Sequence, residues 1–278
     1  MYDRIVVPLD GSRLAEVALP YAEELASKVG CELILLTVLE SGEACEYEKY
    51  YMYVQKVAKL TKRHAEKYLE NGGCKATEVG TATRTGNPAE AIIEYTSQGG
   101  FPLIIMASHG RSGVSRWAVG SVADKVVRGT KWQPVMLIRA KESRSDIREK
   151  RILKKALVPL DGSVRSRAII PYIKEIASKL QMELTLLQVV PPTNHTHTDA
   201  EAYLQMECHT LEDEGITARY EVGVGAAADK IIDLANELAF DLVAMSTHGK
   251  TGAIPWSLGG VAQKVFLGGN TPLLLVRE

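Results

Sequence analysis

The stretch ASHGRSGVSRWAVGSVADKV at residues 107–126 has the residue types and spacing of a site for a phosphate group. It follows the apolar run at 103–106, which predicts a buried strand, and it leads into a segment of helical period. Gly110 and Gly120 let the backbone approach an anion closely, and the N–H groups and dipole of a helix that begins at Ser121 attract negative charge. The spacing fits neither the pattern GxxxxGK[ST] nor a GxGxxG after the first strand. A flexible turn is the simpler interpretation of the same glycines.

Two other segments follow predicted strands and bear on the same site. In PLDGS at residues 8–12, the carboxylate of Asp10 could accept hydrogen bonds from a ligand, for instance from an amino group on a base. Equally, Asp10 or Ser12 could cap the helix that follows. At the end of the next strand, Thr37 and Val38 could wall a flat apolar pocket or belong to an ordinary strand core.

The chain contains one pattern twice. VPLDGS occurs at 7–12 and again at 158–163, and STHGKTGAIPWSLGGVAQKV at 246–265 repeats the glycine-rich stretch. ELILLTV is matched by ELTLLQV, GNPAEAII by GAAADKII, and PVMLIR by PLLLVR, in the same order. Agreement from end to end indicates duplication of a whole domain. The predicted domains are 1–140 and 152–278, joined by a charged linker at 141–151.

Within each copy, apolar runs alternate with segments of helical period. The runs are rich in Val, Ile and Leu without polar alternation, as expected when both faces of a strand are covered. This order favours an α/β fold: two tandem doubly wound, Rossmann-like domains, each with a five-stranded parallel sheet, related by a pseudo-twofold axis. Ligands of such sheets bind at the carboxyl ends of strands, where the strand order reverses. The predicted strands are 3–9, 32–39, 75–83, 103–107, 134–139, 155–160, 183–190, 217–224, 241–246 and 272–277, and the predicted helices of the first copy are 13–29, 49–70, 87–99 and 120–129.

Composition is that of an ordinary globular protein. Of 278 residues, 46% are hydrophobic and 24% charged, and the net charge is −1. So small a net charge gives no reason to expect nucleic acid or an anionic membrane as a partner. The sequence begins directly with a strand-like pattern, so we expect no signal peptide, and its apolar runs are too short to span a bilayer. Four cysteines without CxxC spacing are interpreted as reduced thiols of a cytoplasmic protein.

The glycine-rich stretch resembles the nucleotide loop of the universal stress protein family. The family pattern is Gly, two residues, Gly, nine residues, Gly, then Ser or Thr. Ala107 stands at the first glycine position, Gly110 and Gly120 at the second and third, and Ser121 at the hydroxyl position. The VPLDGS strand end and the turn at Gly86 also match, and both halves take part. The chain is therefore similar to a tandem member of the family.

The second copy departs further from the family pattern. Ser246 stands at the first glycine position, Gly249 and Gly259 follow at the correct spacing, and Gly260 replaces the hydroxyl residue. The backbone amides of Gly259 to Val261 could still face an anion. We expect the second site to be the weaker one because its hydroxyl donor is missing.

The resemblance implies an adenine-nucleotide site in each half, with ATP or a related nucleotide as ligand and Mg²⁺ held through its phosphates. It implies no catalytic residue and no metal site formed by the protein. The implied first-site residues are Pro8, Leu9, Asp10, Val38, Met106, Ala107, His109, Gly110, Arg111, Gly120, Ser121 and Val122. The implied weaker-site residues are Pro159, Leu160, Asp161, Val189, Met245, Ser246, Gly249, Gly259, Gly260 and Val261.

Three functions remain open. The first is a nucleotide-binding regulatory protein of the stress response, with little or no hydrolysis and with a regulatory partner protein that the sequence does not name. The second is an oligomerising scaffold that no longer binds nucleotide, favoured by Ala107, Ser246 and Gly260. The third is an enzyme of the related adenine-nucleotide hydrolase superfamily, for which we find no placed general base. We also expect a homodimer, and antiparallel pairing of 134–139 with 272–277 within one chain.

Some conspicuous residues have plainer interpretations. HTHTD at 195–199 has a metal-like composition, but we predict a solvated loop. Trp117 and Trp256 recur within the glycine-rich stretches, and packing against a neighbouring helix or domain is their simpler role. The tyrosine-rich segment at 46–53 could present aromatic side chains to a partner, or could form a helix packed on its own domain.

Overall fold

The computed structural model describes residues 2–40, 47–70, 77–109, 119–139, 152–192, 197–248 and 258–277. The chain divides into two compact units, Met1–Ile152 and Leu153–Glu278, and each is an α/β domain with a five-stranded parallel sheet. The predicted linker at 141–151 lies outside the described residues. The predicted pseudo-twofold axis and the pairing of the last strand of each half remain predictions.

The first unit has the strand order β3-β2-β1-β4-β5, in which neighbouring strands are parallel. The order reverses between β1 and β4, which is where a doubly wound sheet leaves a crevice at its carboxyl edge. Its strands are β1 (Arg4–Leu9), β2 (Glu32–Leu39), β3 (Val79–Thr85), β4 (Pro102–Ala107) and β5 (Val135–Ile138). Its helices are the 3₁₀ turn η1 (Ala15–Ala18), α1 (Leu19–Val29), α2 (Tyr47–Glu70), α3 (Pro88–Ser97) and α4 (Ser121–Gly129).

The second unit repeats this topology with the order β10-β9-β6-β7-β8, again with parallel neighbours. Here the order reverses between β6 and β9. Its strands are β6 (Lys155–Pro159), β7 (Glu183–Val190), β8 (Ala218–Val224), β9 (Leu242–Ser246) and β10 (Leu273–Val276). Its helices are α5 (Val164–Arg167), α6 (Ile170–Leu180), α7 (His197–Asp213), α8 (Ala227–Glu237) and α9 (Gly260–Gly268).

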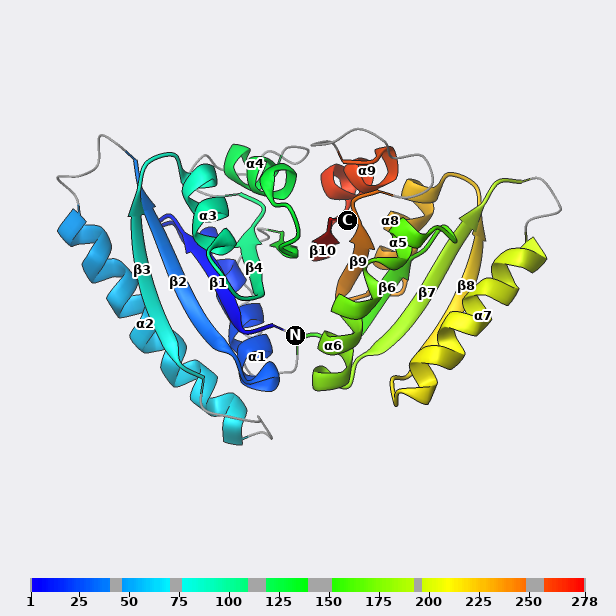
Figure 1. Ribbon diagram of the computed structural model, residues 1–278, viewed down its shortest axis with the longest axis horizontal. Coiled ribbons are helices and arrows are strands. Elements are labelled where there is room, and N and C mark those ends of the chain that lie inside the picture. The colour runs from blue at the N-terminus through cyan, green and yellow to red at the C-terminus, as the bar shows by residue number, and fades with distance from the viewer. Residues whose placement is uncertain are drawn as a thin grey trace. The chain divides into compact units, whose positions relative to one another are not determined.

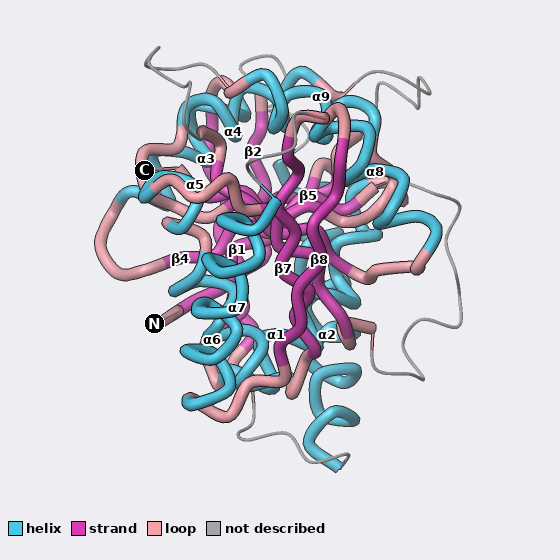
Figure 2. The backbone as a smooth tube through the Cα atoms, turned by 90° about the vertical axis from the view of Figure 1, so that its right-hand side faces the viewer, coloured by secondary structure: helices cyan, strands magenta, loops and turns pink. Residues whose placement is uncertain are grey.

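Helices cover both faces of each sheet, which follows from the right-handed crossovers of parallel strands. In the first unit α1 packs against α2 on one face, and α3 packs against α4 on the other (Figure 1). In the second unit β7 and β8 lie between α6 and α7 on one side and α8 on the other (Figure 2). The central strands are therefore buried on both faces, and every residue of β4 is buried. This explains why the strand sequences lack polar alternation.

The structure corrects three details of the predicted elements. The strand predicted at 75–83 is β3, at Val79–Thr85, because its extent is set by pairing along β2, from Leu33 to Leu39. The helix predicted at 13–29 starts as the 3₁₀ turn η1, and the α-helix begins only at Leu19, with Pro20 in its first turn, where the missing N–H costs no hydrogen bond.

The loop predicted at 195–199 is wrong for its last three residues, because α7 begins at His197. Ala200, Leu204 and Leu211 give this segment one buried face at helical spacing, and that burial outweighs the loop-like composition at its start. Among the described residues, none of the helices is both long and apolar enough to cross a bilayer.

Candidate functional site

A cavity of about 260 Å³ lies in the first unit at the carboxyl ends of β1, β2 and β4, where the strand order reverses. Strand ends supply one part of its wall, and α3 and the first turn of α4 supply the rest. Its lining residues are Pro8, Leu9, Asp10, Ala15, Leu36, Val38, Glu40, Pro88, Ile92, Met106, Ala107, Ser108, His109, Gly120, Ser121, Val122 and Ala123.

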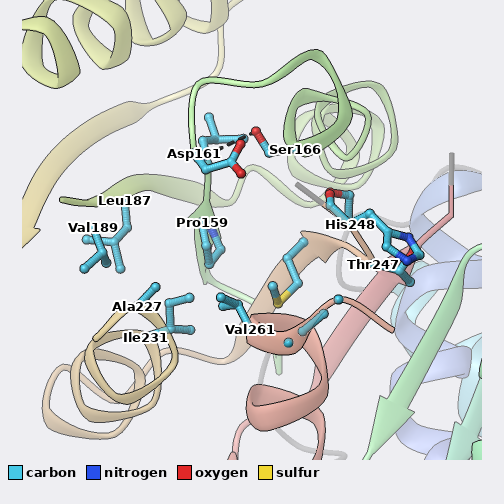
Figure 3. Close-up of a pocket in the computed structure, with 16 residues that line it drawn as sticks. Pro159, Asp161, Ser166, Leu187, Val189, Ala227, Ile231, Thr247, His248 and Val261 are labelled. Atoms are coloured by element: carbon cyan, nitrogen blue, oxygen red, sulfur yellow. Dashed lines mark hydrogen bonds between the residues drawn. The ribbon is translucent and has the colours of Figure 1, made fainter. Parts of the chain in front are cut away.

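The second unit has a smaller cavity, of about 120 Å³, at the equivalent strand ends. Leu187 and Val189 face Ala227 and Ile231 across one side of this cavity, and Asp161 lies on another side (Figure 3). Apart from Glu40, each lining residue of the first cavity has its repeat partner here. The lining residues are Pro159, Leu160, Asp161, Ser166, Leu187, Val189, Ala227, Ile231, Met245, Ser246, Thr247, His248, Gly259, Gly260, Val261 and Ala262.

The structure brings together every described residue that the sequence assigned to a site. The predicted residues Gly110, Arg111 and Gly249 lie outside the described residues, as do Trp117 and Trp256. Thr37 does not line the cavity: its side chain is buried on the opposite face of β2, because side chains alternate along a strand.

Sequence reasoning missed several lining residues. Leu36 could have been found from its spacing of two from Val38, and Pro88 and Ile92 from the repeated GNPAEAII segment. Glu40 lies at the same spacing of two from Val38, but it has no counterpart in the second cavity. The other missed residues are Ala15, Ser108 and Ala123 in the first unit, and Ser166, Leu187, Ala227, Ile231, Thr247, His248 and Ala262 in the second.

Asp10 and Ser12 together organise one end of the first cavity. The backbone N–H and the hydroxyl of Ser12 both donate to Asp10 Oδ1, at 2.9 and 2.6 Å, and Ser12 Oγ accepts from the N–H of Ala15 at 3.1 Å. Gly11 between them has φ +85°, a conformation that glycine adopts without strain. The hydroxyl of Ser12 therefore holds the N–H of Ala15, the first residue of η1, and the carboxylate that lines the cavity holds Ser12 in place.

The corresponding end of the second cavity is more polar. Ser163 donates its N–H to Asp161 Oδ1 at 3.0 Å, and its hydroxyl accepts from the N–H of Ser166 at 3.0 Å. Ser166 stands where the first unit has Ala15, and its hydroxyl accepts from the N–H of Asp161 at 3.2 Å. The second cavity thus has an extra hydroxyl beside its carboxylate.

The other end of the first cavity is the N-terminus of α4. The N–H of Gly120 donates to the carbonyl of Ser108 at 2.8 Å, and a Cβ at Gly120 would lie 3.1 Å from that oxygen. Gly120 therefore lets its backbone approach the carbonyl of Ser108 closely, and its own N–H is already bonded to that carbonyl. The next three N–H groups, at Ser121, Val122 and Ala123, have no acceptor among the described residues, as expected for the first turn of a helix. These groups and the helix dipole make this end suited to an anion.

The same geometry recurs at α9 and corrects one expectation. Gly259 donates its N–H to the carbonyl of Thr247 at 2.8 Å, so its amide does not face an anion as the sequence suggested. Gly260 and Val261 follow in the first turn, and a Cβ at Gly260 would meet nothing within 4 Å.

Ala107 and Ser246 fit without strain where the family pattern has glycine. They are the last residues of β4 and β9, and among the described residues only Gln181 and Ala239 are non-glycine residues with positive φ. The hydroxyl of Ser246 donates to the carbonyl of His248 at 2.6 Å and so is held by its own loop.

A histidine near the start of each glycine-rich stretch pairs with the preceding hydroxyl residue. His109 Nδ1 lies 3.0 Å from Ser108 Oγ, and His248 Nδ1 lies 3.1 Å from Thr247 Oγ1. Ser108 and Thr247 are both buried, and they line the two cavities with their hydroxyls engaged by the neighbouring histidines. These pairs hold the strand end that leads into each glycine-rich stretch.

Charged groups near the two cavities are engaged in contacts with the protein. Asp124, in the first turn of α4, accepts from Arg128 Nε with both carboxylate oxygens, at 2.9 and 3.0 Å. Close to Asp161, burial raises the pKa of Tyr203 to about 12, and the charges of Glu207 and Asp161 act in the same direction. Within the described parts of the chain, no group of three or more His, Cys, Asp or Glu is placed to hold a metal ion.

Comparison with known proteins gives the family. The universal stress protein family matches residues 1–139 and 153–277. The chain is 30% identical over 150 residues to universal stress protein YxiE of Bacillus subtilis, covering 50% of this chain and 100% of that protein. It is 24% identical over 300 residues to universal stress protein Slr1230 of Synechocystis, covering 98% of this chain and 99% of that protein.

The same fold recurs in a solved structure. The crystal structure of a universal stress protein from Archaeoglobus fulgidus superposes with a TM-score of 0.72 at 20% identity, covering 100% of this chain and 99% of that one. Two family matches within one chain, with relatives that align along its whole length, establish what the repeats indicated. The chain belongs to the universal stress protein family and carries two of its domains in tandem.

Proposed function

We propose that this chain binds an adenine nucleotide in its first cavity, and more weakly in its second, as a cytoplasmic regulatory protein of the stress response. The observation that carries the proposal is the polarity of each cavity. One end has a carboxylate beside aliphatic walls, and the other has the N-terminus of a helix with N–H groups that lack an acceptor among the described residues. A base with an exocyclic amino group suits the first end, and phosphates suit the second.

The apolar walls support the assignment of the base. Leu36, Val38 and Met106 line the same cavity as Asp10, and Ile92 of α3 lines it as well. Binding sites for small ligands are largely apolar, with a few polar groups that fix orientation. Asp10 is the group that would distinguish adenine from guanine, because it attracts an amino group and repels a carbonyl oxygen. Mg²⁺ would be held through the phosphates and would neutralise part of their charge.

We propose regulation by occupancy because, among the described residues of the first turn of α4, we find no carboxylate that is placed to orient water for rapid phosphoryl transfer. A carboxylate or amide must orient the attacking water, and a positive group must stabilise the developing charge. Asp124, the acidic residue in the first turn of α4, is already paired with Arg128. We expect steady-state ATP turnover below about 1 s⁻¹, the low end of ordinary enzyme rates.

Titration calorimetry of the full chain with Mg²⁺ and either ATP or GTP tests the proposal. We expect ATP to bind, and GTP to bind roughly tenfold or more weakly, because its base would place a carbonyl against Asp10. Asp10→Asn is the matched variant, since it keeps an oxygen acceptor for Ser12 and replaces the other oxygen by NH₂. This variant should weaken ATP binding and narrow the difference in affinity between ATP and GTP.

Mass spectrometry of small molecules released from the purified protein shows which nucleotide travels with it. A wild-type chain that takes up no nucleotide by either method refutes the proposal and leaves the oligomerising scaffold as the better description. A turnover well above the stated bound would move the chain to the enzyme class.

A further inference from the structure

Helices α2 and α7 occupy the same place in the two units but carry opposite charge. Each follows the second strand of its sheet and precedes the third, and each lies along the outer strands of its own unit (Figure 1). α2 contains six Lys and Arg residues against three Glu. α7 contains five Asp and Glu residues and no Lys or Arg. The two helices thus pack in the same way within their units but differ in the charge of their exposed side chains.

The positive charges of α2 lie on its exposed face. Lys56, Lys59, Lys62 and Arg63 are exposed, and none of them forms an ion pair within the described residues. Met52, Lys56, Lys59 and Arg63 follow one another at spacings of three and four, which places them in one stripe along the helix. Val54 and Val57 are buried on the opposite face.

The negative charges of α7 lie on the corresponding face. Asp199, Glu212 and Asp213 are exposed and likewise form no ion pair within the part of the chain that the structure describes. Asp199, Met206 and Asp213 recur every seven residues, and so form a stripe opposite the buried face. Two acidic residues of α7 differ from these: Glu207 is buried and accepts from Arg167 Nε at 2.6 Å, and Glu201 lies 3.4 Å from His197 Nδ1.

Each stripe also exposes long apolar side chains among its charges. Met52 is 62% exposed and Leu60 42% exposed on α2, and Met206 is 59% exposed on α7. Methionine adapts its shape to a partner surface and is common at protein interfaces. An apolar centre with charges on either side is the usual arrangement of an interface between proteins.

We propose that the exposed stripe of α2 on one copy of this chain docks against the exposed stripe of α7 on a second copy. Both members of the complementary pair are encoded in every chain, so self-association needs no other partner. The stripes also match in length: Met52 to Arg63 spans about 17 Å of helix, and Asp199 to Asp213 about 21 Å, at 1.5 Å per residue.

The size of the contact sets its strength. A single pair of helices buries less than the roughly 1,200–2,000 Å² of a stable interface, so each contact is weak. Its charges lie near the surface, so added salt weakens the association. Two such contacts in a closed dimer reinforce one another, whereas one contact per chain pair gives larger, open assemblies.

Sedimentation velocity of the full chain, at several protein concentrations and at low and high salt, tests the proposal. Three variants are compared with the wild type: Lys56→Glu/Lys59→Glu/Arg63→Glu on α2, Asp199→Lys/Asp213→Lys on α7, and the control Lys131→Glu/Lys179→Glu/Lys230→Glu. The control reverses as many exposed positive charges as the α2 variant does, at positions outside α2 and α7. Circular dichroism checks that each variant is folded.

We expect the wild type and the control to associate at low salt and to dissociate as salt rises. Each of the two helix variants alone should self-associate at least about tenfold more weakly than the wild type, because α2 and α7 then carry charge of the same sign. An equimolar mixture of the two helix variants should associate again, since the reversed α2 then meets the reversed α7.

The mixing result separates this contact from a purely structural effect. A wild type that stays monomeric at every concentration and salt overturns the proposal, as does association that both helix variants retain. A mixture that stays monomeric overturns it as well, even if each variant alone has lost association. The proposal is also wrong if α2 binds another anionic partner while the α7 variant has no effect on self-association.

Discussion

Substitutions at Ser121 and Gly260 perturb most directly the end of each cavity where we propose that phosphate binds. Ser121 is the first residue of α4 and exposes its hydroxyl, and Gly260 is the first residue of α9 and has none. The residue before each is a glycine fixed by close approach to a carbonyl, at Gly120 and Gly259. The variants Ser121→Ala and Gly260→Ser therefore remove or add one hydroxyl without altering that approach.

The magnitude follows from the chemistry of the lost bond. A hydrogen bond to a charged group is worth about 1.5–3 kcal/mol, which corresponds to about ten- to a hundredfold in affinity. Ser121→Ala should weaken the tighter site by that factor. Gly260→Ser should strengthen the weaker site, because a Cβ there meets nothing within 4 Å and the added side chain fits without moving its neighbours.

Calorimetric titration of ATP with Mg²⁺ into the wild type and both variants measures the effect. Gly260→Ala is the matched control, since it adds the Cβ and stiffens the helix start without a hydroxyl. It should raise folding stability by about 0.4–1 kcal/mol and leave nucleotide affinity near that of the wild type. If Ser121→Ala binds as the wild type does, or only the second unit takes up ligand, the assignment of phosphate recognition to these loops is wrong.

Three further outcomes are expected. Gly120→Ala should lower folding stability by about 1–3 kcal/mol, because its Cβ would lie 3.1 Å from the carbonyl oxygen of Ser108. Thermal unfolding measures this with Gly260→Ala as the control variant, and equal unfolding temperatures of the two variants would contradict it. Tyr203 has a pKa raised by burial from 10.0 to about 12, so its contribution to stability is complete below pH 10.0 and is lost as pH rises towards 12. Denaturant unfolding should show a smaller fall in stability over this range for Tyr203→Phe, and an unchanged fall would refute the assignment. Cys208 is buried, and burial raises the pKa of its thiol to about 11. A thiol reagent at neutral pH should therefore modify Cys208 slowly in the folded chain and rapidly in the unfolded chain. Equal rates of modification would count against its burial.

The sequence predicted the strands and the strand-end residues of both cavities well. A strand that is covered on both faces is apolar along its length, which is a clear sequence pattern. Each such run also occurs in both halves of the chain, which supports its assignment as a strand. Asp10 and Met106 could be placed together because parallel strands end at one edge of the sheet.

Features that depend on contacts between distant elements could not be predicted. The start of β3 depends on its register against β2, and the contribution of α3 to the cavity depends on which of its faces meets the sheet. The bond between the N–H of Gly120 and Ser108 links two ends of a loop, and no local pattern reveals it.

The two cavities also indicate which positions of a duplicated site are free to differ within this chain. Gly11 and Gly162 are both glycine, and both have positive φ, where a side chain would be strained.

Gly120 and Gly259 are both glycine for another reason, because a Cβ at either would lie 3.1 Å or less from a carbonyl oxygen. Ser121 and Gly260 differ, and there a side chain meets open space. Backbone geometry therefore holds the shape of the two cavities fixed, while the side chains that face their interior differ between the copies. The same reasoning applies to α2 and α7, whose buried faces keep one packing role while their exposed faces carry opposite charge.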